Sequence, residues 1–140
     1  MSGSAAILLV EDNPDDEQLI LRAFKSAGVG EGIDVARNGR EAIDYLFSTA
    51  PPPKLILLDL KLPKMGGLEV LQALRLENRT RLIPVVVFTS SIEQTDVLTS
   101  YDLGANSYIR KPVDYKELND AIKQICAYWL ETNVSPPRDR

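Results

Sequence analysis

The sequence contains no histidine and only one cysteine, Cys126, among its 140 residues. Without histidine the chain cannot build a Ser-His-Asp or Cys-His catalytic arrangement, bind zinc through histidine or act as a phosphohistidine donor. A single cysteine cannot form a disulfide bond within the chain, which favours a reducing compartment. We therefore expect a cytoplasmic protein whose chemistry does not depend on histidine.

Long apolar runs and runs of basic residues are also missing. The longest apolar run near the N-terminus covers residues 5–10 and ends directly at Glu11 and Asp12. A secretory signal needs a core of about 7–15 apolar residues, and a membrane-spanning helix needs about 20. The 20 acidic and 16 basic residues give a net charge of −4. The composition therefore predicts neither a membrane partner nor a nucleic-acid partner.

The remaining composition is ordinary for a globular domain, with 44% hydrophobic and 26% charged residues. A chain of this length corresponds to one domain and can bury a full core without disulfide bonds. We expect a single domain over residues 1–134, followed by a short polar tail at 135–140 that opens with Ser-Pro-Pro.

Short apolar runs alternate with amphipathic stretches along the chain. Runs typical of strands lie at residues 7–10, 33–36, 55–58, 83–88 and 107–110. Helical periodicity covers residues 14–27, 41–47, 68–77 and 93–103, and a last helix after Asp114 extends into 127–133. Five repeats of strand and helix predict an α/β fold with a parallel sheet covered on both faces. Five strands favour a flavodoxin-like, doubly wound sheet of order 2-1-3-4-5 with five helices.

Polar residues follow four of the predicted strands. In chain order they are Glu11 and Asp12, then Asp59, then Thr89 and Ser90, then Lys111. The carboxyl ends of parallel strands meet at one edge of the sheet, where ligands of open α/β folds bind. We therefore expect three carboxylates, hydroxyls and an ammonium group to converge there.

This combination favours phosphoryl transfer. Three neighbouring carboxylates repel one another, and a divalent cation relieves the repulsion. Ligands that offer only oxygen favour Mg²⁺ over zinc. With a metal at Asp12 and Asp59 and an ammonium group at Lys111, Asp59 can stay ionised and attack phosphorus to form an acyl phosphate. Lys111 and Thr89 would then supply partners for the phosphoryl oxygens.

The motifs at the strand ends resemble those of two-component response-regulator receiver domains. They are LLVEDN at 8–13, LLDL at 57–60 with Pro63 and MGG at 65–67, FTS at 88–90 and YIRKP at 108–112. The resemblance covers residues 6–127 and implies that a sensor histidine kinase or a phosphotransfer protein donates a phosphoryl group to the chain. It further implies a protein that catalyses its own phosphorylation and dephosphorylation but is not a metabolic enzyme.

The resemblance implies roles for individual residues at this edge. Asp59 would be the phosphoacceptor. Asp12, Asp59 and the backbone carbonyl of Lys61 would bind Mg²⁺ directly, and Glu11 would act through a metal-bound water. Lys111 would pair with the phosphoryl group.

Further implied roles concern the response to phosphorylation. Thr89 would move toward the phosphoryl group and Tyr108 would rotate inward after it, as a coupled switch. Lys61 and Ser91 lie at positions where members of the family tune the hydrolysis rate. The Lys111-Pro112 peptide bond would be cis.

The C-terminal segment carries a narrower resemblance. Residues 127–133 extend the last helix and include Tyr128, Trp129 and Leu130. Tyrosine and tryptophan are favoured anchors at interfaces. With the EDNPDD motif at 11–16, this segment resembles stand-alone receivers that partner phytochrome kinases, some of which are homodimers. The resemblance implies a bacteriophytochrome partner and a homodimer.

Several of these residues have structural alternatives. Glu11 and Asp12 could cap the helix that follows them, because acidic groups favour a helix N-terminus. Tyr108 could be half-buried packing, and Trp129 could cover the domain's own core.

Other functions are compatible with this architecture. A pseudo-receiver would bind proteins independently of phosphorylation, but the complete set of acidic, hydroxyl and lysine residues argues against it. A haloacid dehalogenase-like phosphatase needs Asp-x-Asp after the first strand, whereas Asp59 follows the third strand and precedes Leu60 and Lys61. A flavodoxin needs a phosphate-binding loop where this chain has Glu11 and Asp12, which would repel a flavin phosphate.

Overall fold

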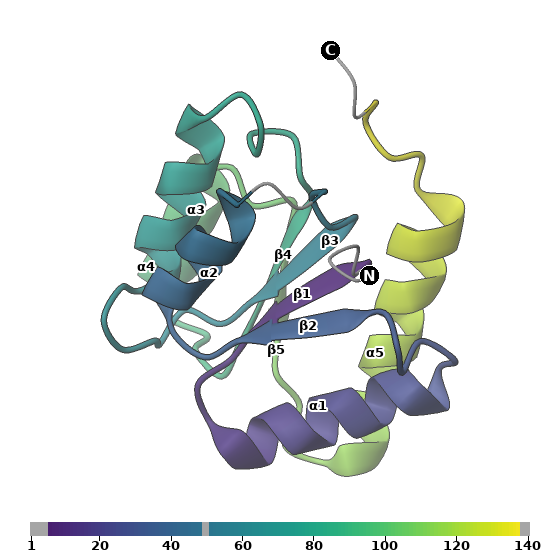
Figure 1. The fold of residues 1–140 in the computed structure, drawn as a ribbon. Coiled ribbons are helices and arrows are strands. Elements are labelled where there is room, and N and C mark those ends of the chain that lie inside the picture. The colour runs from purple at the N-terminus through teal and green to yellow at the C-terminus, as the bar shows by residue number, and fades with distance from the viewer. Residues whose placement is uncertain (1–5, 49–50, 138–140) are drawn as a thin grey trace.

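The computed structural model describes residues 6–48 and 51–137 (Figure 1). The strands are β1 (Ile7–Val10), β2 (Ile33–Ala36), β3 (Leu55–Leu58), β4 (Val85–Thr89) and β5 (Ser107–Arg110). The helices are α1 (Pro14–Ser26), α2 (Gly39–Leu46), α3 (Gly67–Leu76), α4 (Gln94–Asp102) and α5 (Tyr115–Cys126), and a π-helical turn, η1 (Ala127–Thr132), follows α5. The predicted domain 1–134 and tail 135–140 include residues 1–5, 49–50 and 138–140, which lie outside the described residues.

The five strands form one parallel sheet of order β2-β1-β3-β4-β5, which confirms the predicted fold. β1 lies between β2 and β3, with Val10 paired to Ala36 on one side and to Leu58 on the other. This register brings the ends of the first three strands level with one another. Helices α1 and α5 cover one face of the sheet, and α2, α3 and α4 lie on the other (Figure 1).

Each face of the sheet packs against its own hydrophobic core. Successive side chains of a strand point to opposite faces, so Leu8 and Val10 of β1 join the core under α2 and α3, while Ile7 and Leu9 join the core under α1 and α5. All four side chains are buried. Burying such a side chain stabilises the fold by about 1.5–3 kcal/mol, which explains why β1 is a continuous apolar run.

Polar residues cap the N-termini of α1 and α5. Asn13 accepts a hydrogen bond from the backbone N–H of Asp16 at 2.9 Å, with Pro14 as the first residue of α1. Asp114 caps α5 in the same way by accepting from the N–H of Glu117. Both helices begin where the sequence predicts them, at residue 14 and directly after Asp114.

Two predicted boundaries were wrong by two residues. β4 begins at Val85 rather than Ile83, because Pro84 has no N–H to donate to a strand ladder. α2 begins at Gly39 rather than residue 41, because Asn38 caps it by accepting from the N–H of Glu41.

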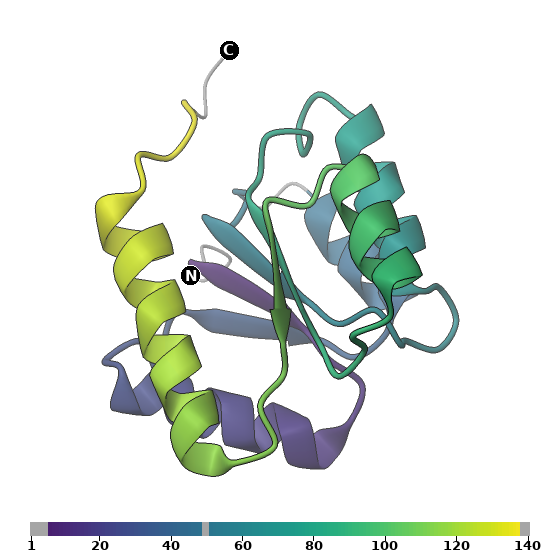
Figure 2. The same cartoon turned by 180° about the vertical axis from the view of Figure 1, so that it is seen from behind.

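The C-terminal extension continues α5 without a break, as Figure 2 shows, but its backbone winds as a π-helix. Trp129 and Leu130 are half-buried and pack against the core under α1 and α5. Tyr128 is 49% exposed and meets the Trp129 ring edge-on. The predicted packing alternative therefore holds for Trp129, and Tyr128 is the exposed aromatic of this segment.

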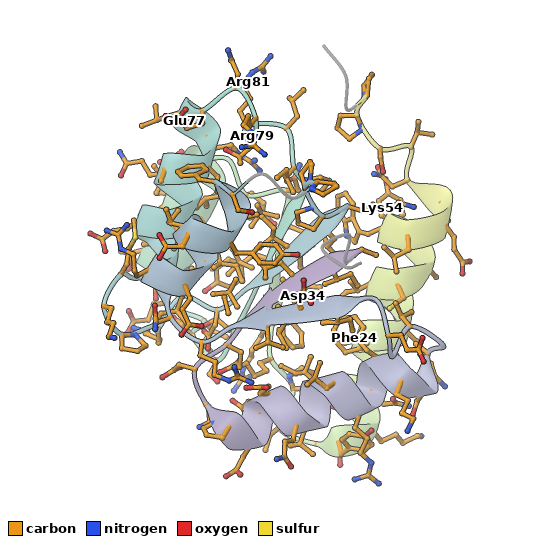
Figure 3. All side chains as sticks on the ribbon, viewed as in Figure 1. Phe24, Asp34, Lys54, Glu77, Arg79 and Arg81 are labelled. Atoms are coloured by element: carbon orange, nitrogen blue, oxygen red, sulfur yellow. The ribbon has the colours of Figure 1, made fainter. Side chains whose placement is uncertain are left out.

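The amino edge of the sheet carries basic residues, with Glu77 nearby (Figure 3). The amino ends of β3 and β4 lie near Lys54, Arg79 and Arg81 (Figure 3), far from the acidic residues that follow β1 and β3. A cavity of about 320 Å³ at this amino edge is lined mainly by proline and aliphatic side chains. Within the described ranges, every helix is too short or too polar to cross a membrane.

Candidate functional site

The three predicted carboxylates meet at the carboxyl edge of the sheet. Glu11, Asp12 and Asp59 each place one carboxylate oxygen within 4.8 Å of the others. Backbone hydrogen bonds hold the two buried members in place, since the N–H of Glu11 donates to Ala36 and that of Asp59 donates to Val10. The side chain of Asp12 is exposed, which gives a cation access to the cluster.

Lys111 lies at the centre of this cluster. Its backbone N–H donates to the carbonyl of Thr89 at 2.7 Å, which fixes it beyond the end of β5. Its Nζ lies 2.8 Å from Glu11 Oε1, 3.0 Å from Asp16 Oδ2 and 3.3 Å from Asp59 Oδ2. An ammonium group has three N–H donors, so these three carboxylates can use all of them.

Burial and neighbouring charge act in opposite directions on the pKa values of Glu11 and Lys111. Burial raises the pKa of Glu11 to about 7, although the hydrogen bond and the charge of Lys111 oppose the rise. Burial would lower the pKa of Lys111, but the hydrogen bond to Glu11 and the charges of Asp59 and Glu11 outweigh it and raise that pKa. Lys111 is therefore charged at neutral pH, and the cluster favours a further positive charge.

The donor set fits a hard divalent cation. Glu11, Asp12 and Asp59 offer only carboxylate oxygens, which suit Mg²⁺ or Mn²⁺ rather than zinc. The backbone N–H of Lys61 donates to Asp59 Oδ1 at 3.4 Å, so the chain turns directly after β3 beside this carboxylate. The side chain of Lys61 is exposed, and Lys111 is the cation that pairs with Glu11 and Asp59 in the described part of the chain.

Thr89 ends β4 with a fully buried hydroxyl. Its Oγ1 has no hydrogen-bond partner among the described residues. Buried polar atoms are nearly always paired, and an unpaired one costs about 1–3 kcal/mol. This hydroxyl therefore remains available for a ligand at the carboxyl edge.

A hydrogen bond between Tyr108 and Ser91 joins β5 to the segment before α4. The Tyr108 hydroxyl donates to the backbone carbonyl of Ser91 at 2.8 Å, and its partly buried ring packs against the core under α2 and α3. Burial raises the pKa of Tyr108, so the phenol stays protonated. The Ser91 hydroxyl donates to Asp96 Oδ2 at 2.5 Å. The Ser91 side chain is thus engaged at the start of α4.

Two sequence-based expectations need correction or addition. The prediction of a cis Lys111–Pro112 bond is wrong, because the described residues contain no cis peptide bond, and trans is the more stable form of most X–Pro bonds. The positions of the strand ends did not indicate Asp16, which reaches Lys111 from the first turn of α1. The signal was its position: a helix capped by Asn13 places Asp16 one turn beyond Asp12, over the same edge.

Comparisons with known proteins agree with this arrangement. The family model for the response regulator receiver domain matches residues 7–123. The chain is 42% identical over 134 residues to the probable methanogenesis regulatory protein FilR2 of Methanothrix harundinacea, covering 93% of this chain and 86% of that one. It is 38% identical over 135 residues to response regulator Rcp1 of Synechocystis, covering 93% and 92%.

Two solved structures are similar over nearly their whole length. The crystal structure of the phosphorylated cyanobacterial phytochrome response regulator RcpA has a TM-score of 0.87 and 40% identity, covering 94% of this chain and 97% of that one. The Mn²⁺-bound form of Rcp1 has a TM-score of 0.85 and 38% identity, covering 94% and 98%.

Proposed function

This chain belongs to the response regulator receiver domain family, and from that premise we propose that it accepts a phosphoryl group on Asp59 with Mg²⁺ and thereby switches a protein-interaction surface. One observation carries the proposal. Glu11, Asp12 and Asp59 each place a carboxylate oxygen within 4.8 Å of the others at one edge of the sheet, and the Lys111 ammonium group hydrogen-bonds Glu11 and Asp59.

The chain's own residues supply the parts of the reaction. A carboxylate oxygen of Asp59 attacks phosphorus, and the bond from phosphorus to the donor's nitrogen or oxygen breaks as the new bond forms. Lys111 already holds Asp59 at 3.3 Å and pairs with a phosphoryl oxygen as negative charge arrives. The unpaired hydroxyl of Thr89 donates to another phosphoryl oxygen.

Asp12, Asp59 and the backbone carbonyl of Lys61 would hold Mg²⁺, with Glu11 acting through a metal-bound water. The ion would neutralise charge on the phosphoryl oxygens. Rcp1 has been crystallised with Mn²⁺, a metal with similar oxygen preference, and RcpA has been crystallised in a phosphorylated form. These relatives support a metal-dependent phosphorylation of this chain.

The proposal includes partners and location. A sensor histidine kinase or a phosphotransfer protein would donate the phosphoryl group in the cytoplasm, and the similarity to phytochrome response regulators supports a bacteriophytochrome as that kinase. The half-exposed ring of Tyr128, next to Trp129 and Leu130, supports a homodimer formed through this segment. Lys61 and Ser91 would tune the lifetime of the phosphorylated form. Ser91 would first have to break the hydrogen bond that its hydroxyl donates to Asp96.

Phosphorylation of the wild-type chain by a small phosphodonor such as acetyl phosphate tests the proposal. With Mg²⁺ we expect intact-protein mass spectrometry to show one added phosphoryl group, in a bond that hydroxylamine cleaves. With a chelator in place of Mg²⁺ we expect background incorporation, because the carboxylates repel an incoming anion when no cation is present. Folded protein that gains no phosphoryl group would instead identify a pseudo-receiver that binds partners independently of phosphorylation.

Replacing Thr89 by valine separates stability from switching. We expect the free energy of unfolding to stay the same or rise by about 1 kcal/mol, since the substitution removes a buried unpaired hydroxyl. Phosphorylation should then no longer move Tyr108, because the phosphoryl group has lost the hydroxyl that it draws inward.

Urea unfolding and the NMR signals of the Tyr108 ring measure the two effects. Ser90→Ala is the matched control, because it removes an exposed hydroxyl from the next position. A Tyr108 ring that responds to phosphorylation in Thr89→Val as it does in the wild type would show that Thr89 does not transmit the change.

A further inference from the structure

The contact between Lys111 and Asp16 has a consequence for the proposed phosphorylation. Glu11, Asp16 and Asp59 take up the three N–H donors of Lys111 Nζ. A phosphoryl group on Asp59 also needs a donor from this ammonium group. One of the present bonds must therefore be released when the phosphoryl group arrives.

The three carboxylates differ in the cost of that release. The side chains of Glu11 and Asp59 are 1% and 8% exposed, so a carboxylate left without its ammonium partner there would lose charge compensation in a poorly solvated place. The Asp16 side chain is 36% exposed. Water can take over its hydrogen bond, and partly exposed ion pairs contribute little net energy. Asp16 is thus the partner that Lys111 can exchange at least cost.

Local structure keeps Asp16 in position for this exchange. Its backbone N–H is held by the Asn13 cap at 2.9 Å, and α1 begins directly beyond the end of β1. Its carboxylate therefore stays beside Lys111, where it also adds negative charge near the place that a phosphoryl group must enter. Both effects oppose the binding of an anion.

We infer that Asp16 is a positioning residue, which holds the Lys111 ammonium group in the unphosphorylated protein and releases it to the phosphoryl group on Asp59. This inference rests on the proposed function. Through Asp16, the first turn of α1 would control how readily the site accepts an anion, and this effect would be separate from metal binding.

Beryllofluoride, an anion that takes the place of a phosphoryl group on an aspartate, tests the inference. In the presence of Mg²⁺, Asp16→Asn should bind beryllofluoride about three- to tenfold more tightly than the wild type, as expected when the carboxylate that competes for Lys111 is replaced by a neutral, weaker acceptor. Asp15→Asn is the matched control: it removes the same charge from the same helical turn, at an exposed residue with no contact to Lys111.

Two further measurements separate positioning from a general structural or charge effect. The affinity for Mg²⁺ alone should change equally in Asp16→Asn and Asp15→Asn, because both lose one charge at a similar place. In a Lys111→Met background, Asp16→Asn should no longer tighten beryllofluoride binding more than Asp15→Asn does, since the ammonium group that Asp16 holds is gone.

Each outcome decides the inference. Selective tightening in Asp16→Asn that disappears without Lys111 supports it. Equal beryllofluoride affinities of the two asparagine variants, or weaker binding by Asp16→Asn, overturn the inference. The proposed function still stands in that case, provided that the wild type binds beryllofluoride. A folded wild type that binds no beryllofluoride and accepts no phosphoryl group overturns both.

Discussion

Replacing Asp59 by asparagine is expected to lower the rate of phosphoryl incorporation by at least about 100-fold, to background. Asparagine keeps the shape of the side chain but has no carboxylate oxygen that can attack phosphorus. Asp59 is the buried carboxylate that touches Lys111 from the end of β3, in the middle of the sheet. Mass spectrometry of the protein after exposure to acetyl phosphate and Mg²⁺ measures the effect.

Asp15→Asn provides the control for this variant, because it removes one negative charge from an exposed position near the same edge. It should incorporate the phosphoryl group at nearly the wild-type rate. A phosphoryl group that persists in Asp59→Asn would contradict the assignment of Asp59. Peptide mapping would then show whether Asp12 or Glu11 carries it, since their oxygens lie within the same cluster.

Replacing Gly67 by alanine is expected to destabilise the protein and displace the residues after Asp59. A Cβ at position 67 would lie 2.3 Å from the carbonyl oxygen of Asp59 and 2.7 Å from the Cα of Leu60. Both are backbone atoms, so no side-chain rotation relieves the contact. Overpacking of this kind costs about 1–3 kcal/mol or more, which exceeds the gain of about 1 kcal/mol in helix propensity from glycine to alanine.

Gly66→Ala is the matched control at the neighbouring position. Its Cβ would lie 3.8 Å from the nearest atom, the carbonyl oxygen of Leu60, and its φ of −71° suits any residue. We expect urea unfolding to show a clear loss of stability for Gly67→Ala and little change for Gly66→Ala. Equally small effects of the two substitutions would indicate that α3 can shift away from Asp59, and that the contact does not position this residue.

The strands were predictable because each is defined by local sequence. Residues 7–10, 33–36, 55–58 and 107–110 form strands as expected. β1 and β3 are buried throughout, and strands buried on both faces make short apolar runs. The edge strands β2 and β5 are mostly half-buried and include polar residues. Alternation with helices then restricts the sheet to few orders, since crossovers between parallel strands are right-handed. Boundaries were less certain where a single residue decides them, as Pro84 and Asn38 do here.

The composition of the site was predictable for a similar reason. Glu11, Asp12, Asp59 and Lys111 follow strands and Thr89 ends one, and parallel strands bring their carboxyl ends to one edge. Knowing the order of the sheet was therefore enough to bring these five residues together. Their individual hydrogen bonds were not predictable, because those depend on how the helices pack around the edge.

The sequence alone thus determined the elements, their order and the edge where the acidic residues gather, because these follow from local hydrophobic patterns and chain direction. Only the tertiary structure decided which groups touch. Lys111 meets Glu11 across 100 positions and Asp16 across 95, Ser91 turns to Asp96, and Trp129 packs on the core. Such contacts require side chains that are distant in sequence to fit within about 3 Å, and this fit is set by the packing of the whole domain.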